Sequence, residues 1–150
     1  MSAWDMSIKG KAPYVGEAAE MSSLVTMQHV DLFTKITGDK NPLHYDEELA
    51  KESIFGGLIV QGGVTSGILN ALVAEMLPGP GTVFLGVEWK FSKAVYVGDE
   101  ITGRVEVLSV RNDKPICELR TTVCNQHGDI CLSGTASTFT VPLKSYQTVS

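Results

Sequence analysis

The sequence predicts an α+β domain in which a curled antiparallel sheet wraps around one long, buried helix. Two observations carry this prediction. Residues 62–77 form a helical segment that is apolar on nearly every side, and such a helix is buried. The segments after it alternate apolar and polar residues with a period of two, which is typical of half-buried strands. The sheet has to curl because it must cover a helix with almost no polar face.

The first predicted elements are a short strand around residues 21–25 and a helix over residues 27–37. The apolar residues of this helix recur at helical spacing and form one stripe: Met27, Val30, Phe33 and Ile36. Thr26 precedes the helix, where its hydroxyl can accept a hydrogen bond from a first-turn amide. Gly38 follows the helix and is expected to end it.

Residues 38–61 are predicted to be irregular apart from one short helix. Asn41-Pro42 is a turn dipeptide, because proline fixes its own φ and moves the preceding residue out of the helical region. A short helix is expected at residues 46–51, opened by Asp46. A Gly-Gly break and three apolar residues then lead to the long helix, which stops at the Pro-Gly-Pro-Gly of residues 78–81.

Four strands are predicted after the long helix. The first has one apolar face, expected to pack in the core, made of Val83, Leu85, Val87, Trp89 and Phe91. The next two alternate in the same way, and the last runs over residues 130–141. Short turns at residues 97–99, 112–114 and 126–129 predict an antiparallel meander. A buried helix wrapped by such a sheet is a hotdog fold. Because its edge strands would be exposed, we expect a homodimer.

Composition narrows the class of protein. The chain has 150 residues, 43% of them hydrophobic and 19% charged, with a formal net charge of −5. We expect a single domain over residues 14–150, after a flexible lead-in or appendage at residues 1–13. Scattered basic residues argue against nucleic acid as a partner. No apolar run reaches the roughly 18 residues of a membrane span, and no signal-peptide pattern opens the chain, so we expect a cytoplasmic protein away from membranes.

The three cysteines are expected to be free strand residues. The number of cysteines is odd and none are in CxxC spacing: they are Cys117, Cys124 and Cys131. An odd count without a secretory signal favours a reducing cytosol over a disulfide framework. The spacing also lacks the close ligand pairs typical of zinc sites, so no metal is expected.

Asp39 and His44 are the candidate catalytic pair. They are a carboxylate and an imidazole close in sequence, in irregular backbone stiffened by Asn41-Pro42. Such a pair can activate water near neutral pH. Asp46 is the rival carboxylate, but its position is that of a helix cap. His29 and His127 are expected to be structural or solvated.

The candidate substrate-binding groups are the amides of Gly62 and Gly63. Gln61-Gly62-Gly63 opens the buried helix, and bare amides at a helix N-terminus carry positive partial charge. They could polarise a thioester carbonyl and hold the enolate-like oxygen that develops when water adds at the β-carbon.

These residues lie within a longer motif. Residues 37–46 read TGDKNPLHYD and residues 59–62 read IVQG, with GVEWKF at residues 86–91 and VGDE at residues 97–100 further on. The motif resembles that of the MaoC-like, (R)-specific enoyl-CoA hydratase family, and the similarity runs from about residue 15 to residue 141.

The resemblance implies a dimeric hotdog enzyme that adds water reversibly to trans-2-enoyl thioesters, on CoA or a carrier protein, without metal or redox cofactor. It assigns catalysis to Asp39 and His44 and the oxyanion contact to the amide of Gly62. Asn70 stands where some relatives place a hydroxyl that steadies the aspartate.

The chain departs from the family at the entrance of the helix. Relatives usually have His-Gly-Met there, whereas Gln61 cannot titrate and Gly63 lacks bulk, so we expect Gln61 and Asn41 to support the site and the acyl pocket to differ in shape. Two alternatives stay open: a thioesterase on the same fold, and a non-catalytic module that binds acyl thioesters or mediates dimerisation.

Overall fold

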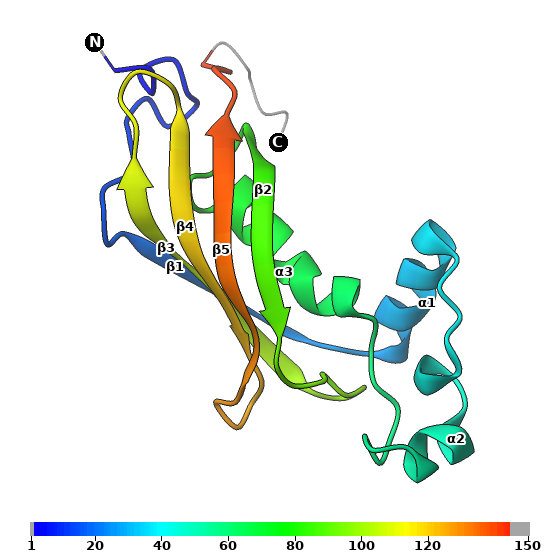
Figure 1. Cartoon of the computed structure of the whole chain (residues 1–150). Coiled ribbons are helices and arrows are strands. Elements are labelled where there is room, and N and C mark those ends of the chain that lie inside the picture. Colours follow the sequence, from blue (N-terminus) through cyan, green and yellow to red (C-terminus); the bar gives the residue numbers. More distant parts are fainter. Residues whose placement is uncertain (1, 145–150) are drawn as a thin grey trace.

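A computed structural model describes residues 2–144 of the chain, so residue 1 and residues 145–150, the end of the predicted domain, lie outside the described residues. The elements run in this order: β1 (Ala18–Leu24), α1 (Met27–Thr37), a 3₁₀ turn (Pro42–His44), α2 (Glu47–Glu52), α3 (Gly62–Glu75), β2 (Thr82–Phe91), β3 (Glu100–Val110), β4 (Ile116–Cys124) and β5 (Ile130–Thr140). The predicted α+β hotdog fold is confirmed (Figure 1).

The five strands form one antiparallel sheet in the order β1-β3-β4-β5-β2. The predicted meander is therefore correct for β3, β4 and β5, whereas β2 pairs with β5 and β1 pairs with β3. The sheet curls around α3, and α1 and α2 project beyond one end of it (Figure 1). The core forms where α3 meets the sheet, and it contains Leu69, Leu72, Val105, Leu119 and Leu132, all 0% exposed.

The predicted core face of β2 is wrong for four of its five residues. Only Trp89 is partly buried against the core, while Val87 and Phe91 in the second half of the strand are 43% and 54% exposed. In the first half, the register of the strand shifts between Phe84 and Gly86. A shift of one residue exchanges the two faces of a strand. Phe84 therefore points to the core side with Trp89, and the two rings pack edge to face with centroids 5.7 Å apart. Val83 and Leu85, expected in the core, are 51% and 58% exposed.

Helix α1 begins and ends as predicted, but only part of its stripe is buried. Val30 is fully buried, whereas Ile36 is 81% exposed because α1 extends past the edge of the sheet. Thr26 is the N-cap, and its backbone amide donates to Nδ1 of His29 at 3.0 Å. His29 is thus a structural residue, as expected.

The N-terminal segment is packed against the sheet and does not form the flexible lead-in that its sequence suggested. Trp4 is 1% exposed and belongs to the hydrophobic core. Its indole nitrogen donates to the carbonyl oxygen of Arg111 at 2.7 Å, and the amide of Ala3 donates to the carbonyl oxygen of Asn112. One aromatic side chain with a satisfied N–H is enough to hold a segment that lacks periodic patterning.

We predict that Trp4→Ala lowers the free energy of unfolding by about 3–5 kcal/mol, because it removes a fully buried indole and leaves a cavity. Urea denaturation followed by circular dichroism measures this loss. Tyr14→Ala is the control, since Tyr14 directly follows this segment and is 68% exposed, so it should change stability by less than about 0.5 kcal/mol. Equal effects of the two substitutions would contradict the packing described for Trp4.

Candidate active site

Asp39 and His44 come together as the sequence predicts. Oδ2 of Asp39 lies 3.8 Å from Nε2 of His44, and the side chains are 39% and 7% exposed, respectively. The separation is longer than a direct hydrogen bond. It is the separation expected of two atoms that one water molecule bridges at about 2.8 Å from each.

The ring of His44 is held in one orientation by the backbone. Its Nδ1 lies 2.7 Å from the carbonyl oxygen of Ile59, and a carbonyl can only accept, so Nδ1 carries the proton. In the neutral ring this leaves Nε2 as an acceptor facing Asp39. The backbone amide of Ile59 in turn donates to the carbonyl oxygen of Leu43 at 3.2 Å, which fixes the loop beside the segment leading into α3.

The turn between the two residues is stabilised by its own side chains. Oδ1 of Asp39 accepts from the amide of Asn41, and Oδ1 of Asn41 accepts from the amide of Leu43, both at 3.1 Å. One oxygen of the Asp39 carboxylate is therefore engaged in the turn while the other faces His44. Asp46, the rival carboxylate, accepts from the amide of Leu49 as the N-cap of α2.

Gln61 links α1 to the start of α3. Its side chain is 2% exposed, and Nε2 donates to the carbonyl oxygen of Val30 and to Oγ1 of Thr34, both at 3.1 Å. Oγ1 of Thr34 donates onward to the carbonyl oxygen of Asp39 at 2.8 Å and lies 2.6 Å from the hydroxyl oxygen of Tyr45. This Gln61–Thr34–Asp39 connection sets the loop of Asp39 and His44 against the N-terminus of α3.

The first two amides of α3 are free to bind a ligand. In the described part of the chain, the amides of Gly62 and Gly63 donate to no other backbone or side-chain group, as expected for the opening residues of a helix. Two aromatic rings cover these glycines. A Cβ on Gly62 would lie 3.2 Å from Phe91, and a Cβ on Gly63 would lie 2.1 Å from Phe33.

A cavity of about 310 Å³ adjoins this helix entrance, and Ile59, Gly62, Thr65, Phe91 and Lys93 are among its lining residues. Asp39 and His44 do not line it themselves. His44 is tied to it through the carbonyl of Ile59. The ammonium of Lys93 donates to Oδ2 of Asp129 at 2.6 Å, and this hydrogen bond, followed by the charge of the carboxylate, raises the pKa of Lys93.

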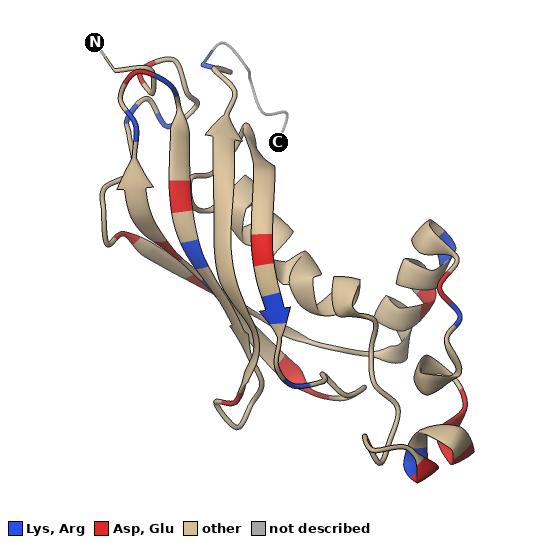
Figure 2. Cartoon of the chain, in the orientation of Figure 1, with Lys and Arg blue, Asp and Glu red and all other residues tan. Residues whose placement is uncertain are grey.

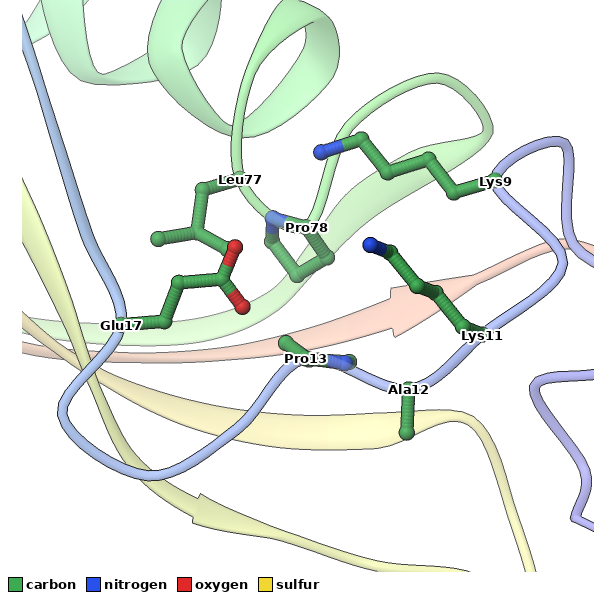
Figure 3. Close-up of a pocket in the computed structure, with 7 residues that line it drawn as sticks. All are labelled: Lys9, Lys11, Ala12, Pro13, Glu17, Leu77 and Pro78. Carbon is green, nitrogen blue, oxygen red and sulfur yellow. The ribbon is translucent and has the colours of Figure 1, made fainter.

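A second cavity, of about 340 Å³, lies at the opposite end of α3 and contains no part of the Asp39–His44 pair. The ammonium groups of Lys9 and Lys11 and the carboxylate of Glu17 point into it (Figure 3). Nζ of Lys9 donates to the carbonyl oxygen of Met76. A cation there stabilises the negative C-terminal end of α3, so we assign this cavity a structural role.

The structure gives Asn70 no contact that would support its suggested role. Its side chain is exposed and, among the described residues, forms no hydrogen bond with Asp39. Sequence reasoning also missed Thr34 and the carbonyl of Ile59. Thr34 stands four residues after Val30 on the buried side of α1, so a polar residue in an apolar stripe was the available signal. A backbone carbonyl leaves no such signal.

Charged residues of both signs occur together on α1 and α2, while α3 is uncharged over nearly its whole length (Figure 2). Among residues 2–144, no group of three His, Cys, Asp or Glu side chains could hold a metal ion. None of the helices in this range combines the length and hydropathy needed to cross a bilayer.

Known proteins share this sequence and fold. A family model described as "MaoC like domain" matches residues 12–126. The chain is 37% identical over 122 residues to the (R)-specific enoyl-CoA hydratase of Aeromonas caviae, covering 81% of this chain and 91% of that protein. It is 32% identical over 122 residues to the 3-hydroxybutyryl-CoA dehydratase of Methylorubrum extorquens, and the match covers 81% of this chain and 77% of that protein. A solved A. caviae (R)-hydratase involved in PHA biosynthesis superposes with a TM-score of 0.83 at 34% identity, covering 87% and 99%.

We predict that Thr34→Val destabilises the protein by about 1–3 kcal/mol, because it leaves a buried donor of Gln61 and the carbonyl of Asp39 without their partner. The free energy of unfolding in urea measures the effect. Thr34→Ser keeps the hydroxyl and should retain most of the stability. If Thr34→Val were no more destabilising than Thr34→Ser, the hydrogen bonds of the hydroxyl would not be what stabilises this junction, because valine loses only the hydroxyl and serine only the methyl group.

Proposed function

The chain belongs to the MaoC-like domain family, and from this membership together with the site geometry we propose its reaction and its mechanism. It is a hydro-lyase that adds water reversibly to a trans-2-enoyl thioester and gives an (R)-3-hydroxyacyl thioester. The observation that carries the mechanism is the 3.8 Å separation of Oδ2 of Asp39 from Nε2 of His44. The substrate carrier is CoA or an acyl carrier protein.

The water molecule that reacts is bound between Asp39 and His44. Because the carbonyl of Ile59 holds the proton of His44 on Nδ1, both the carboxylate and Nε2 face the water as acceptors. Two acceptors at one water orient its two protons and direct an oxygen lone pair toward the substrate. Such a placed pair supplies general base catalysis.

Addition forms one bond from the water oxygen to the β-carbon, and the electrons of the double bond move onto the thioester. The carbonyl oxygen then carries enolate character, and the free amides of Gly62 and Gly63 stabilise that charge. The Asp39–His44 pair returns the proton removed from water to the α-carbon. The product therefore contains all the atoms of the substrate and of the water molecule. No electron is transferred to another group, so the scheme calls for no redox cofactor.

The apolar edge of β2 supports a homodimer. β2 lies at one edge of the sheet, and its exposed side chains include Val83, Leu85, Val87 and Phe91, each at least 43% exposed. A long apolar edge strand is a surface for pairing with another strand. A second copy of the chain, related by a two-fold axis, would cover this edge with the same residues.

The cysteines support a location in a reducing compartment, which we take to be the cytoplasm. All three are free. Burial raises the pKa of the Cys117 thiol to about 11, so this residue is a poor nucleophile at neutral pH. Cys117 of β4 and Cys131 of β5 belong to the hydrophobic core, and Cys124 is half-buried at the end of β4.

We predict that Asp39→Asn lowers kcat/KM for hydration of crotonyl-CoA by about a hundredfold to ten-thousandfold, because the amide cannot take the proton of water. Loss of the conjugated enoyl absorbance measures hydration. Asp46→Asn is the matched control, since asparagine also caps a helix, and it should retain near wild-type rates. Wild-type turnover by Asp39→Asn would exclude the mechanism, and release of free thiol in place of hydration would indicate a thioesterase.

We also predict that Leu85→Lys shifts the protein from dimer toward monomer. The side chain is 58% exposed in the single chain, so the substitution should leave the fold intact while placing a charge in the dimer interface. Light scattering after size exclusion measures the molar mass. Ile54→Lys is the control, because Ile54 is 96% exposed and follows α2, so it is not part of the β2 edge. A monomeric wild-type protein would contradict the dimer.

A further inference from the structure

The hydroxyl of Tyr45 closes the loop that carries Asp39 and His44. Its oxygen lies 2.6 Å from Oγ1 of Thr34, which itself donates to the carbonyl oxygen of Asp39 at 2.8 Å. Tyr45 directly follows His44 in the chain. One hydroxyl group on α1 therefore joins the first residue of the loop to the residue that follows its last.

The direction of these hydrogen bonds follows from counting protons. The hydroxyl of Thr34 has one proton, which it donates to the carbonyl of Asp39, and it accepts from Nε2 of Gln61 at 3.1 Å. A hydroxyl oxygen has two acceptor lone pairs, so Tyr45 donates its proton to the second one. Oγ1 of Thr34 then forms every hydrogen bond available to it, one donated and two accepted.

The carboxylate of Asp31 competes for the same phenol proton. Its Oδ1 lies 3.1 Å from the hydroxyl oxygen of Tyr45, at the long limit of O–H···O hydrogen bonds, which usually measure about 2.5–3.0 Å. The contact between Tyr45 and Thr34 is shorter, at 2.6 Å. Because one proton cannot serve both oxygens, we assign it to the shorter contact. Asp31 lies at an exposed position of α1, where water can hydrate its carboxylate.

This closure matters because the two candidate catalytic side chains are held by different parts of the chain. The ring of His44 is held by the carbonyl of Ile59, just before α3, whereas the backbone of Asp39 is held by Thr34 of α1. The 3.8 Å separation of the two side chains therefore depends on how α1 sits against the loop. The hydroxyl of Tyr45 fixes that position from the His44 end.

We infer that Tyr45 is a positioning residue for the hydration reaction, and that its hydroxyl, by donating to Thr34, sets the separation of Asp39 and His44. This inference rests on the proposed hydration of enoyl thioesters. The hydroxyl acts through Thr34 and the backbone of Asp39, whereas the free amides at the start of α3 bind the thioester. Its loss should therefore lower kcat and leave KM nearly unchanged.

The test measures kcat and KM for hydration of crotonyl-CoA by the full chain. Tyr45→Phe removes the hydroxyl and keeps the ring, and kcat should fall by about fivefold to fiftyfold while KM changes by less than about twofold, because a small displacement of a positioned base is costly. Tyr14→Phe is the matched control, since Tyr14 is 68% exposed, and it should keep wild-type values. Thermal unfolding followed by circular dichroism verifies that both variants are folded.

Two further variants identify the group through which the phenol acts. In Asp31→Asn, the new amide can donate to the phenol oxygen and leave the phenol proton for Thr34, so kcat should stay at or above the wild-type value. Adding Tyr45→Phe to Thr34→Val should lower kcat no further than Thr34→Val alone, because two substitutions that remove the same contact are not additive.

A wild-type kcat in Tyr45→Phe would overturn the inference and leave the proposed function intact. Equal losses of kcat in Asp31→Asn and Tyr45→Phe would also contradict it, because the phenol would then act through Asp31. Independent, additive effects of Tyr45→Phe and Thr34→Val would exclude their shared hydrogen bond as the cause. If the wild-type chain hydrates neither crotonyl-CoA nor longer enoyl-CoA substrates, the proposed function itself fails.

Discussion

The loop that carries Asp39 and His44 is held on α3 by hydrogen bonds that join segments far apart in the sequence. Gln61 binds Val30 and Thr34 of α1, and His44 binds the carbonyl of Ile59 just before α3. Together with the hydrogen bond from the amide of Ile59 to the carbonyl of Leu43, they fix the Asp39 loop relative to the helix N-terminus. Because these donors and acceptors are buried, breaking any one leaves an unsatisfied polar group, and the geometry is held firmly.

The rest of the fold can be understood as support for that junction. Helix α3 has no polar face, so the sheet encloses it on one side and keeps its N-terminus at a fixed position relative to β2 and β3. The same helix leaves one flank uncovered by the sheet, where Gly63, Gly67 and Ala71 are small enough to leave a cavity. Helix α3 therefore buries one face against the sheet and lines a cavity with another.

Gln61 shows how a polar residue can replace a titratable one at such a junction. An amide donates two hydrogen bonds at every pH, and both are made here. Oε1 of Gln61 is buried and, among the described residues, is without a hydrogen-bond partner in the chain. The residue thus holds α1 and α3 together without adding a proton-binding group beside Asp39 and His44.

The sequence by itself determined the elements and the identity of the candidate catalytic pair. Period-two alternation defined β3 to β5, the apolar run defined α3, and the turn dipeptide Asn41-Pro42 placed Asp39 and His44 in one loop. These features are local, because spacing along the chain fixes which side chains share a face or a turn.

Other features depend on contacts between distant residues, and only the tertiary structure decided them. The bulge in β2 exchanged the faces of Val83 and Phe84, Trp4 anchored a segment without periodicity, and Ile36 was left exposed because α1 passes the edge of the sheet. The tautomer of His44 depends on the carbonyl of Ile59, fifteen residues away. The space above Gly63 depends on the ring of Phe33, which occupies it. Each of these features depends on which distant group contacts the residue. The spacing of residues along the chain does not determine such contacts.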